Sequence, residues 1–205
     1  MEHTIQRVTK GLASLKEFTN MYHSYIKWAD RPSRKLYWSL HEESKMVGVF
    51  ALSSAFTFPG VIKEYMAERS IVFNEVGNNI IYCLKGQEDR NAGTKFLKLC
   101  RLDAKLWWRE RYADELKLMQ TFILPTREDG DPRPRIGAVY KADNWTFLGM
   151  TKGETQGVRS LYGEDREKYK DDPRMEIRRF QNGETKYLLR EYRKTEEKMI
   201  YVRSL

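Results

Sequence analysis

Residues 79–94 read NIIYCLKGQEDRNAGT, and this stretch decides the fold class. Its first six residues form a nearly continuous apolar run, which is typical of a strand buried on both faces of a sheet. The polar remainder contains two glycines and leads into a long amphipathic helix that begins near Asn91. A second apolar run covers 116–124. Strand, helix and strand in this order predict a βαβ unit with two neighbouring parallel strands in an α/β sheet.

The residues before this unit predict a helix, a hairpin and a second short helix. Apolar residues recur at helical spacing over 9–29. Two strands at 35–40 and 46–52 flank a polar turn that includes His41. A short helical segment opens at Pro59-Gly60 and extends to about Met66.

After the second apolar run the chain passes through a Pro- and Gly-rich excursion at 126–135. Residues 139–140 and 146–150 then predict two short strands on either side of an Asn-Trp turn. Near the C-terminus, the Asn182-Gly183 pair predicts a β-hairpin. The predicted strands of that hairpin are 176–180 and 185–190.

A change in composition after Gly153 divides the chain. We predict a main domain over 1–153 and a C-terminal extension over 154–205 that carries the hairpin. A chain of 205 residues can bury enough apolar surface to fold without disulfides or metals. Cys83 and Cys100 both lie in apolar segments, so we expect two reduced core thiols. With two Cys and three His, a zinc site of the usual spacing is not expected.

Membrane insertion and secretion are not indicated. No run of 18 apolar residues exists, and residues 1–10 lack the apolar centre of a signal peptide. We therefore expect a cytoplasmic protein, either a monomer or a homodimer, with no membrane partner.

The chain carries a net charge of +8. Excess Lys and Arg attract polyanions, so double-stranded DNA is an expected partner. The alternative is an ordinary solubilising surface with more Lys than Glu.

The loop before the long helix is a candidate anion site. A strand that leads into a helix start presents free N–H groups and the positive end of the helix dipole. Arg90 adds a fixed positive charge there, and Asn91 and Thr94 add polar side chains. The competing interpretation is a helix start capped by Asn91, and the sequence leaves both open.

Residues 137–153 read GAVYKADNWTFLGMTKG, a mixture of glycines, aromatic residues and an amide that a plain strand does not need. Glycine allows a backbone to approach a ligand closely. A tyrosine hydroxyl at the mouth of a cleft can donate or accept a proton, so Tyr140 and Asn144 are candidate site residues. His23 lies on the first predicted helix, where a packed or surface histidine is the competing interpretation.

With these segments placed, the chain resembles the Mom-like phage DNA-modification branch of the GNAT acyltransferase fold. The resemblance rests on four segments, of which the last is the most specific. They are 22–25 (YHSY), 46–53 (MVGVFALS), 78–82 together with 90–94, and 137–145 together with Gly149, Thr151 and Gly153. This resemblance implies a GNAT-like mixed central sheet with flanking helices, in which two central parallel strands separate to admit an acyl-CoA.

The resemblance also implies roles for individual residues. Acetyl-CoA or another acyl-CoA would be held by Arg90, Asn91, Ala92, Gly93, Thr94 and Tyr82. Tyr140 would act as an acid or hydrogen-bond donor near the thioester, with Asn144 beside it, and His23 would lie near the acceptor. The implied reaction modifies adenine bases in DNA and would protect phage DNA against restriction inside the host cytoplasm.

One departure from the family pattern bears on the acceptor. Relatives tend to carry an acidic residue followed by proline after the fifth strand, whereas this chain has Ile123-Leu124-Pro125. Asp129 or Asp131 in the following loop could substitute. Two alternatives therefore stay open: an acyltransferase acting on a protein or small-molecule amine, and a non-catalytic DNA-binding relative.

Overall fold

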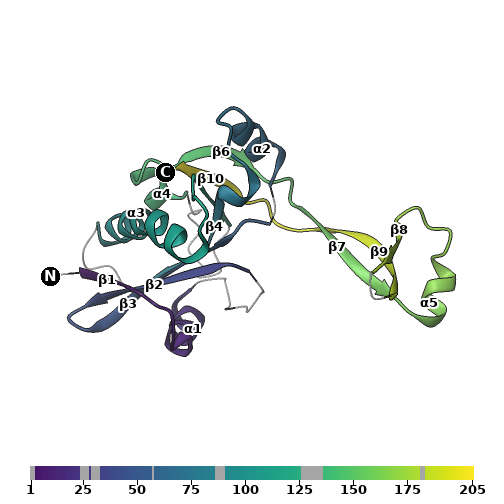
Figure 1. Ribbon diagram of the computed structural model, residues 1–205, viewed down its shortest axis with the longest axis horizontal. Coiled ribbons are helices and arrows are strands. Elements are labelled where there is room, and N and C mark those ends of the chain that lie inside the picture. Colours follow the sequence, from purple (N-terminus) through teal and green to yellow (C-terminus); the bar gives the residue numbers. More distant parts are fainter. Residues whose placement is uncertain are drawn as a thin grey trace. The chain divides into compact units, whose positions relative to one another are not determined.

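The computed structural model describes residues 3–23, 28, 33–56, 58–85, 91–125, 136–180 and 183–205 (Figure 1). The chain forms two compact units. The main unit combines Met1–Met150 with Lys198–Leu205, and the second unit is Thr151–Glu197.

The main unit is built on a seven-stranded mixed sheet in the order β1-β2-β3-β4-β5-β10-β6. Its strands are β1 (His3–Arg7), β2 (Lys35–Glu42), β3 (Lys45–Ser54), β4 (Val76–Leu84), β5 (Leu118–Ile123), β6 (Thr146–Met150) and β10 (Met199–Ser204). Strands β4 and β5 run parallel, and the other neighbours in this sheet pair antiparallel. The predicted hairpin, the two parallel strands and the mixed α/β sheet with flanking helices are confirmed.

Helices cover both faces of this sheet. The helices are α1 (Leu12–Tyr22), α2 (Gly60–Ala67), α3 (Ala92–Tyr112) and α4 (Ala138–Ala142), with a short 3-10 turn η1 (Phe73–Glu75) before β4. Leu15 and Phe18 of α1 pack on one face with Val49 of β3, and α2 lies on the same face over Val76. On the other face, Phe96 and other apolar residues of α3 pack with β2 and β3, and Tyr140 of α4 joins that core.

This second face holds the largest core of the molecule. Trp38, Phe50, Phe96 and Trp108 are each fully buried there. Complete burial of an apolar side chain of this size contributes roughly 1.5–3 kcal/mol. The burial of α3 against β2 and β3 therefore fixes the helix whose start is the predicted anion site.

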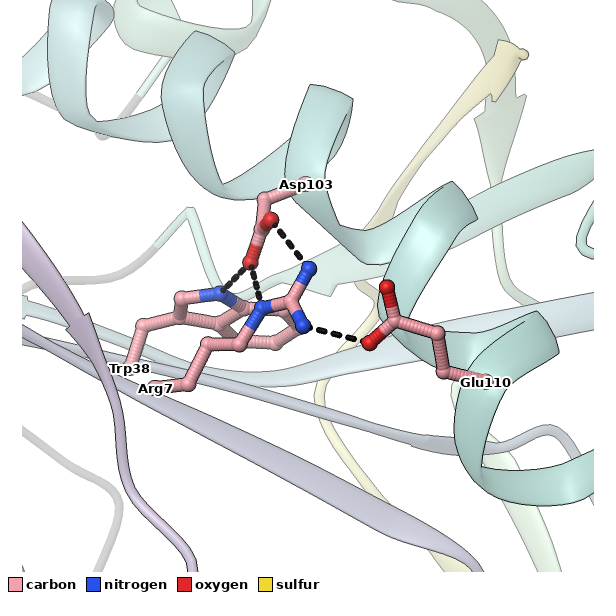
Figure 2. Close-up of polar contacts among 4 residues, drawn as sticks. All are labelled: Arg7, Trp38, Asp103 and Glu110. Atoms are coloured by element: carbon pink, nitrogen blue, oxygen red, sulfur yellow. Dashed lines mark hydrogen bonds and ion pairs between the residues drawn. The ribbon is translucent and has the colours of Figure 1, made fainter.

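A polar cluster ties the first strand to this helix, as Figure 2 shows. Arg7 donates two hydrogen bonds to Asp103, of 2.8 and 2.7 Å, and a third of 2.5 Å to Glu110. The indole Nε1 of Trp38 donates to the same Asp103 carboxylate at 2.7 Å. Burial by itself raises the pKa of Asp103, but the hydrogen bonds from Arg7 and Trp38 outweigh it, so the pKa is lowered.

The second unit is a small antiparallel sheet in the order β7-β9-β8 with one short helix. Its elements are β7 (Glu154–Leu161), α5 (Gly163–Lys168), β8 (Met175–Arg179) and β9 (Thr185–Lys194). Strands β8 and β9 pair with Ile177 opposite Tyr187, which confirms the predicted hairpin. Gly183 has φ +82°, a conformation that the turn requires and that favours glycine.

Three features of the main unit differ from the sequence expectations. Residues 199–204 form β10 between β5 and β6, so the division at residue 153 assigns a strand of the main sheet to the predicted extension. Residues 139–140 belong to helix α4 and not to a strand. Strand β1 has no counterpart in the prediction, because its five residues, HTIQR, lack an apolar pattern and the strand is held by pairing with β2.

Candidate functional site

The parallel strands β4 and β5 pair over a short distance and then separate. They are joined in three register pairs, Val76–Leu118, Gly77–Met119 and Asn78–Gln120. Beyond the third pair, β4 continues beside β3 as far as Leu84, and β5 continues beside β10 as far as Ile123. Strand β4 thus stays paired with β3 and β5 stays paired with β10, while the pairing between β4 and β5 ends. We call the region beyond the third pair, where the two strands no longer pair with each other, the β4–β5 gap.

A bulge in β4 gives a physical reason for this separation. Leu52 of β3 lies opposite Asn79, but the preceding Ala51 lies opposite Ile81, so Ile80 is an extra residue. A bulge bends its strand and increases the local twist. It begins directly after the last residue that pairs with β5. At that point the hydroxyl of Thr121 reaches the Asn79 carbonyl oxygen at 3.4 Å, a long contact across the narrow end of the gap.

The Tyr140 hydroxyl lies at the start of the gap. It donates a hydrogen bond of 2.7 Å to Oδ1 of Asn79, the first β4 residue beyond the paired region. The ring of Tyr140 stacks on Tyr201, at 6.0 Å between centroids, and meets Trp145 edge-on at 5.1 Å. Tyr140 is 8% exposed. The structure therefore holds the predicted catalytic hydroxyl rigidly where the two parallel strands part.

Helix α4 is fixed in place by an ion pair with α3. Arg101 donates from Nε and Nη2 to the two carboxylate oxygens of Asp143, at 2.7 and 2.9 Å, and both side chains are buried. The indole Nε1 of Trp145 donates to the same carboxylate at 3.0 Å. This bidentate geometry orients the end of α4 and so the tyrosine that α4 carries.

Gly137 begins α4 with φ +64°. A Cβ at this position would lie 2.7 Å from the ring of Tyr201, so only glycine lets the two approach. We expected a glycine of this segment to bring the backbone close to a ligand. At Gly137 the backbone instead lies close to the core residue Tyr201.

Asn144 lies in the turn between α4 and β6. It has φ +58°, which asparagine tolerates better than most residues, and its carbonyl accepts a hydrogen bond of 2.6 Å from Arg203. Its side chain is exposed. The polar stretch before Trp145 is explained in large part by the buried Asp143 and by this turn.

The start of α3 follows the end of β4, as the βαβ prediction requires. Asn91 precedes the first helical residue, but its side chain makes no capping hydrogen bond, so the capped-start interpretation loses its main support. Ala92 and Gly93 are buried and Thr94 is half-buried. Arg90 lies outside the described residues.

Tyr82 lies on β4 beyond the bulge and faces α3. Its ring meets Tyr140 edge-on at 5.9 Å and lies 6.1 Å from Phe96. Its hydroxyl is buried and bonds to none of the described residues. Burial, followed by the proximity of Tyr140, raises the pKa of Tyr82 well above its ordinary value, so the group stays protonated.

His23 is the residue that ends α1, and it is half-buried. Helix α1 packs on the face of the sheet that carries Ile81 and Cys83, whereas Tyr140 packs on the opposite face. The structure therefore brings Tyr140 and Tyr82 together and places His23 apart from them.

The prediction for the two cysteines agrees with the structure. Cys83 and Cys100 are free and buried, and burial raises the pKa of the Cys83 thiol to about 11. Among the described residues, no group of three or more His, Cys, Asp and Glu is arranged to hold a metal ion. In the same part of the chain, no helix has the length and apolar character needed to span a membrane.

No protein-family model and no curated protein sequence matches the chain significantly. Solved structures do match. Arabidopsis thaliana NAA60 in complex with acetyl-CoA aligns with a TM-score of 0.54 and 7% identity, over 100% of this chain and 99% of that one. A Bacillus subtilis acetyltransferase in complex with CoA aligns with a TM-score of 0.51 and 9% identity, again over 100% and 99%. The chain has the same α/β fold as these two proteins, which is the mixed-sheet fold that the GNAT resemblance implies. At these identities the likeness establishes the fold and not the reaction.

Sequence reasoning missed Asn79, Asp143 and Arg101. The sequence does contain a signal for Asn79: it is an asparagine at the edge of an otherwise apolar strand, and a buried amide needs hydrogen-bond partners. The ion pair joins residues 42 positions apart, and no pattern in the sequence connects them.

Proposed function

We propose that this protein is an acyl-CoA-dependent transferase that moves an acyl group onto an amine. The observation that carries the proposal is the β4–β5 gap with the Tyr140 hydroxyl fixed at its start. An extended thioester chain fits between two strands that have stopped pairing, because their facing N–H and C=O groups need partners. The neighbours of the same fold that were solved with acetyl-CoA or CoA support this cofactor.

The diphosphate of the cofactor would lie at the start of α3. Asn91 precedes a 21-residue helix whose first residues are Ala92, Gly93 and Thr94, and the backbone N–H groups and helix dipole at such a start favour an anion. Arg90, immediately before this turn, would add a charge-assisted contact. Tyr82, with its buried hydroxyl, would contact the part of the cofactor that enters the gap.

Tyr140 would protonate the leaving group. The acceptor nitrogen attacks the thioester carbonyl, a C–N bond forms, the C–S bond breaks, and the thiolate takes the Tyr140 proton. The proton that the amine loses balances the one that Tyr140 gives up. The helix of His23 packs on the face of the sheet opposite to Tyr140, so we propose His23 only as a residue near the acceptor, as the resemblance implies, and return the amine proton to the Tyr140 phenolate.

The acceptor we propose is an adenine base in double-stranded DNA. This rests on the Mom-like residues at 137–153 and on the net charge of +8, which favours a polyanion. A base inside a duplex must be extruded before it can reach a buried thioester. Modified adenine would protect phage DNA from restriction.

One observation favours a second acceptor class. Strand β5 ends at Ile123 and is followed by Leu124-Pro125, so the carboxylate of the Mom-like pattern is missing at this point. A protein or small-molecule amine is a stronger nucleophile than the adenine exocyclic amine and needs less help from a carboxylate. The alternative is therefore an acyltransferase for such an amine.

Two experiments test the proposal in order. Calorimetric titration with acetyl-CoA should show binding, and its absence would remove the enzymatic proposal. Nucleoside mass spectrometry of a plasmid co-expressed with the protein should then show a modified adenosine. An unmodified profile from a preparation that binds acetyl-CoA would favour the protein or small-molecule acceptor. DNA binding without acetyl-CoA binding would identify a non-catalytic relative.

A matched pair of variants tests the role of Tyr140. Tyr140→Phe should lower turnover by about 10²-fold or more, as expected for loss of a general acid, and leave acetyl-CoA binding in place. Tyr112→Phe is the control, because Tyr112 also makes hydrogen bonds, to Lys35, but lies at the far end of α3. Equal activity of the two variants would contradict the assignment.

A further inference from the structure

We infer that Asn79 is a positioning residue whose side-chain amide fixes the Tyr140 oxygen at the start of the β4–β5 gap, from which the O–H turns to the thiolate during proton transfer. This inference rests on the proposed acyl transfer. It adds a residue that acts on the reaction through Tyr140.

The orientation of the Asn79 amide is determined by its neighbours. Its Nδ2 lies 3.1 Å from the carbonyl oxygen of Ala51 and 2.8 Å from that of Ile81. A flipped amide would point an oxygen at two carbonyl oxygens, which are acceptors only. Nitrogen must therefore face these carbonyls, and Oδ1 must face Tyr140.

Because Oδ1 can only accept, it binds the neutral phenol and not the phenolate. The Tyr140 O–H is thus directed at Asn79, and the ring is fixed by Tyr201 and Trp145. Asn79 is 6% and Tyr140 8% exposed, so water competes little for this bond. The Tyr140 oxygen is held in one place before any ligand arrives, so proton transfer requires only that the O–H rotate from Oδ1 of Asn79 to the thiolate sulfur, which lowers the cost of reaching the reactive geometry.

The same amide also spans the bulge. Ala51 and Ile81 are opposite each other across β3 and β4 and lie on one side of the extra residue Ile80, while Asn79 lies on the other. The two bonds from Nδ2 therefore brace the point at which β4 bends away from β5. One side chain links the shape of the gap to the direction of the hydroxyl.

This arrangement also favours recovery after turnover. Once the proton has moved to the thiolate, the Tyr140 oxygen and Oδ1 of Asn79 face each other as two acceptors at about hydrogen-bonding distance. Two acceptors without a shared proton repel each other. This repulsion favours rapid reprotonation of the phenolate by the proton that the amine releases.

A double-mutant cycle tests the inference, with release of free CoA thiol from acetyl-CoA in water as the assay. Asn79→Ala should lower kcat about tenfold and change the KM for acetyl-CoA by about twofold at most. In a Tyr140→Phe background, Asn79→Ala should cause no further loss, because the residue acts through the hydroxyl. Asn78→Ala is the matched control: it is the same residue type on the same strand, but it points to the other face, opposite Ser53.

Three results would overturn the inference alone while acetyl-CoA binding by the wild type stands. The first is Asn79→Ala activity equal to that of the wild type, and the second is an equal loss in both backgrounds. The third does not require a folded variant at position 79: proton NMR of the wild type should show a slowly exchanging hydroxyl proton that is lost in Tyr140→Phe, and its absence would contradict the bond. Absence of acetyl-CoA binding by the wild type would instead overturn the proposed function, and this inference with it.

Discussion

Arg101 of α3 and Asp143 at the end of α4 form a two-bonded ion pair in which both side chains are almost fully buried. The pair joins the helix that begins at the predicted anion site to the helix that carries Tyr140. A charge buried in this way depends on its partner, because the protein interior cannot replace the lost hydration.

Removing one partner should be costly. Arg101→Ala or Asp143→Ala leaves a buried charge uncompensated, and we expect a loss of about 3–5 kcal/mol in the free energy of unfolding, measured by urea denaturation. Arg109→Ala is the matched control, because its pair with Glu115 is exposed and should contribute less than about 1 kcal/mol. Equal losses in the two arginine variants would show that the buried pair contributes little.

Arg90 is predicted to hold the cofactor phosphates. Arg90→Ala should weaken acetyl-CoA binding by about 1.5–3 kcal/mol, the range of a charge-assisted hydrogen bond, as measured by calorimetry. Arg111→Ala is the matched control, because Arg111 lies in the last turn of α3, at the end of the helix where the dipole repels an anion. That variant should bind acetyl-CoA like the wild type. Unchanged affinity in Arg90→Ala would remove Arg90 from the proposed site.

The Arg7–Asp103 pair should make stability depend on pH in the acid range. The folded-state pKa of Asp103 is lowered. The contribution of Asp103 to the free energy of unfolding is therefore complete above the unfolded pKa of about 3.9, and it is lost as pH falls through the folded-state pKa. The urea midpoint should therefore drop on acidification below about pH 4. In Asp103→Asn this drop should be smaller, and an unchanged pH profile in that variant would show that other carboxylates cause it.

The second unit should be removable. Met150 and Met199 are register partners in the β6–β10 pair, so the chain leaves and re-enters the main unit at one point of the sheet. We expect that replacing residues 151–198 by a two-residue Asn-Gly turn leaves a main unit that unfolds cooperatively, as monitored by circular dichroism. It should also still bind acetyl-CoA. Loss of cooperative unfolding would show that the second unit is required for the stability of the first.

The part of the fold that follows from local pattern could be predicted from the sequence. The run 79–84 and the amphipathic helix after Asn91 led to the parallel strands that form the gap, because burial imposes a visible periodicity. The segment of Tyr140 is singled out because it mixes residues that an ordinary strand does not contain, and the catalytic role of Tyr140 stays a prediction. The resemblance to a known fold supplied the separation of the strands.

The parts that depend on distant partners could not be predicted. Strand β10 lies between β5 and β6, although the whole second unit separates it from them in the chain. Residues 139–140 form a helix because Gly137 and the Arg101–Asp143 pair define its two ends. Asn79 acquires its partners only through the bulge in β4, and a single sequence does not reveal a bulge.

The position of β10 constrains how the chain can fold during synthesis. The ribosome makes all of Thr151–Glu197 before it makes β10, so the second unit can close its own hairpins first. Until residues 199–204 emerge, β5 has an open edge towards the place that β10 will occupy, and β6 has no neighbour in the sheet. A nascent chain stalled at that stage would present unpaired strand edges, the kind of surface on which chaperones act and aggregation begins.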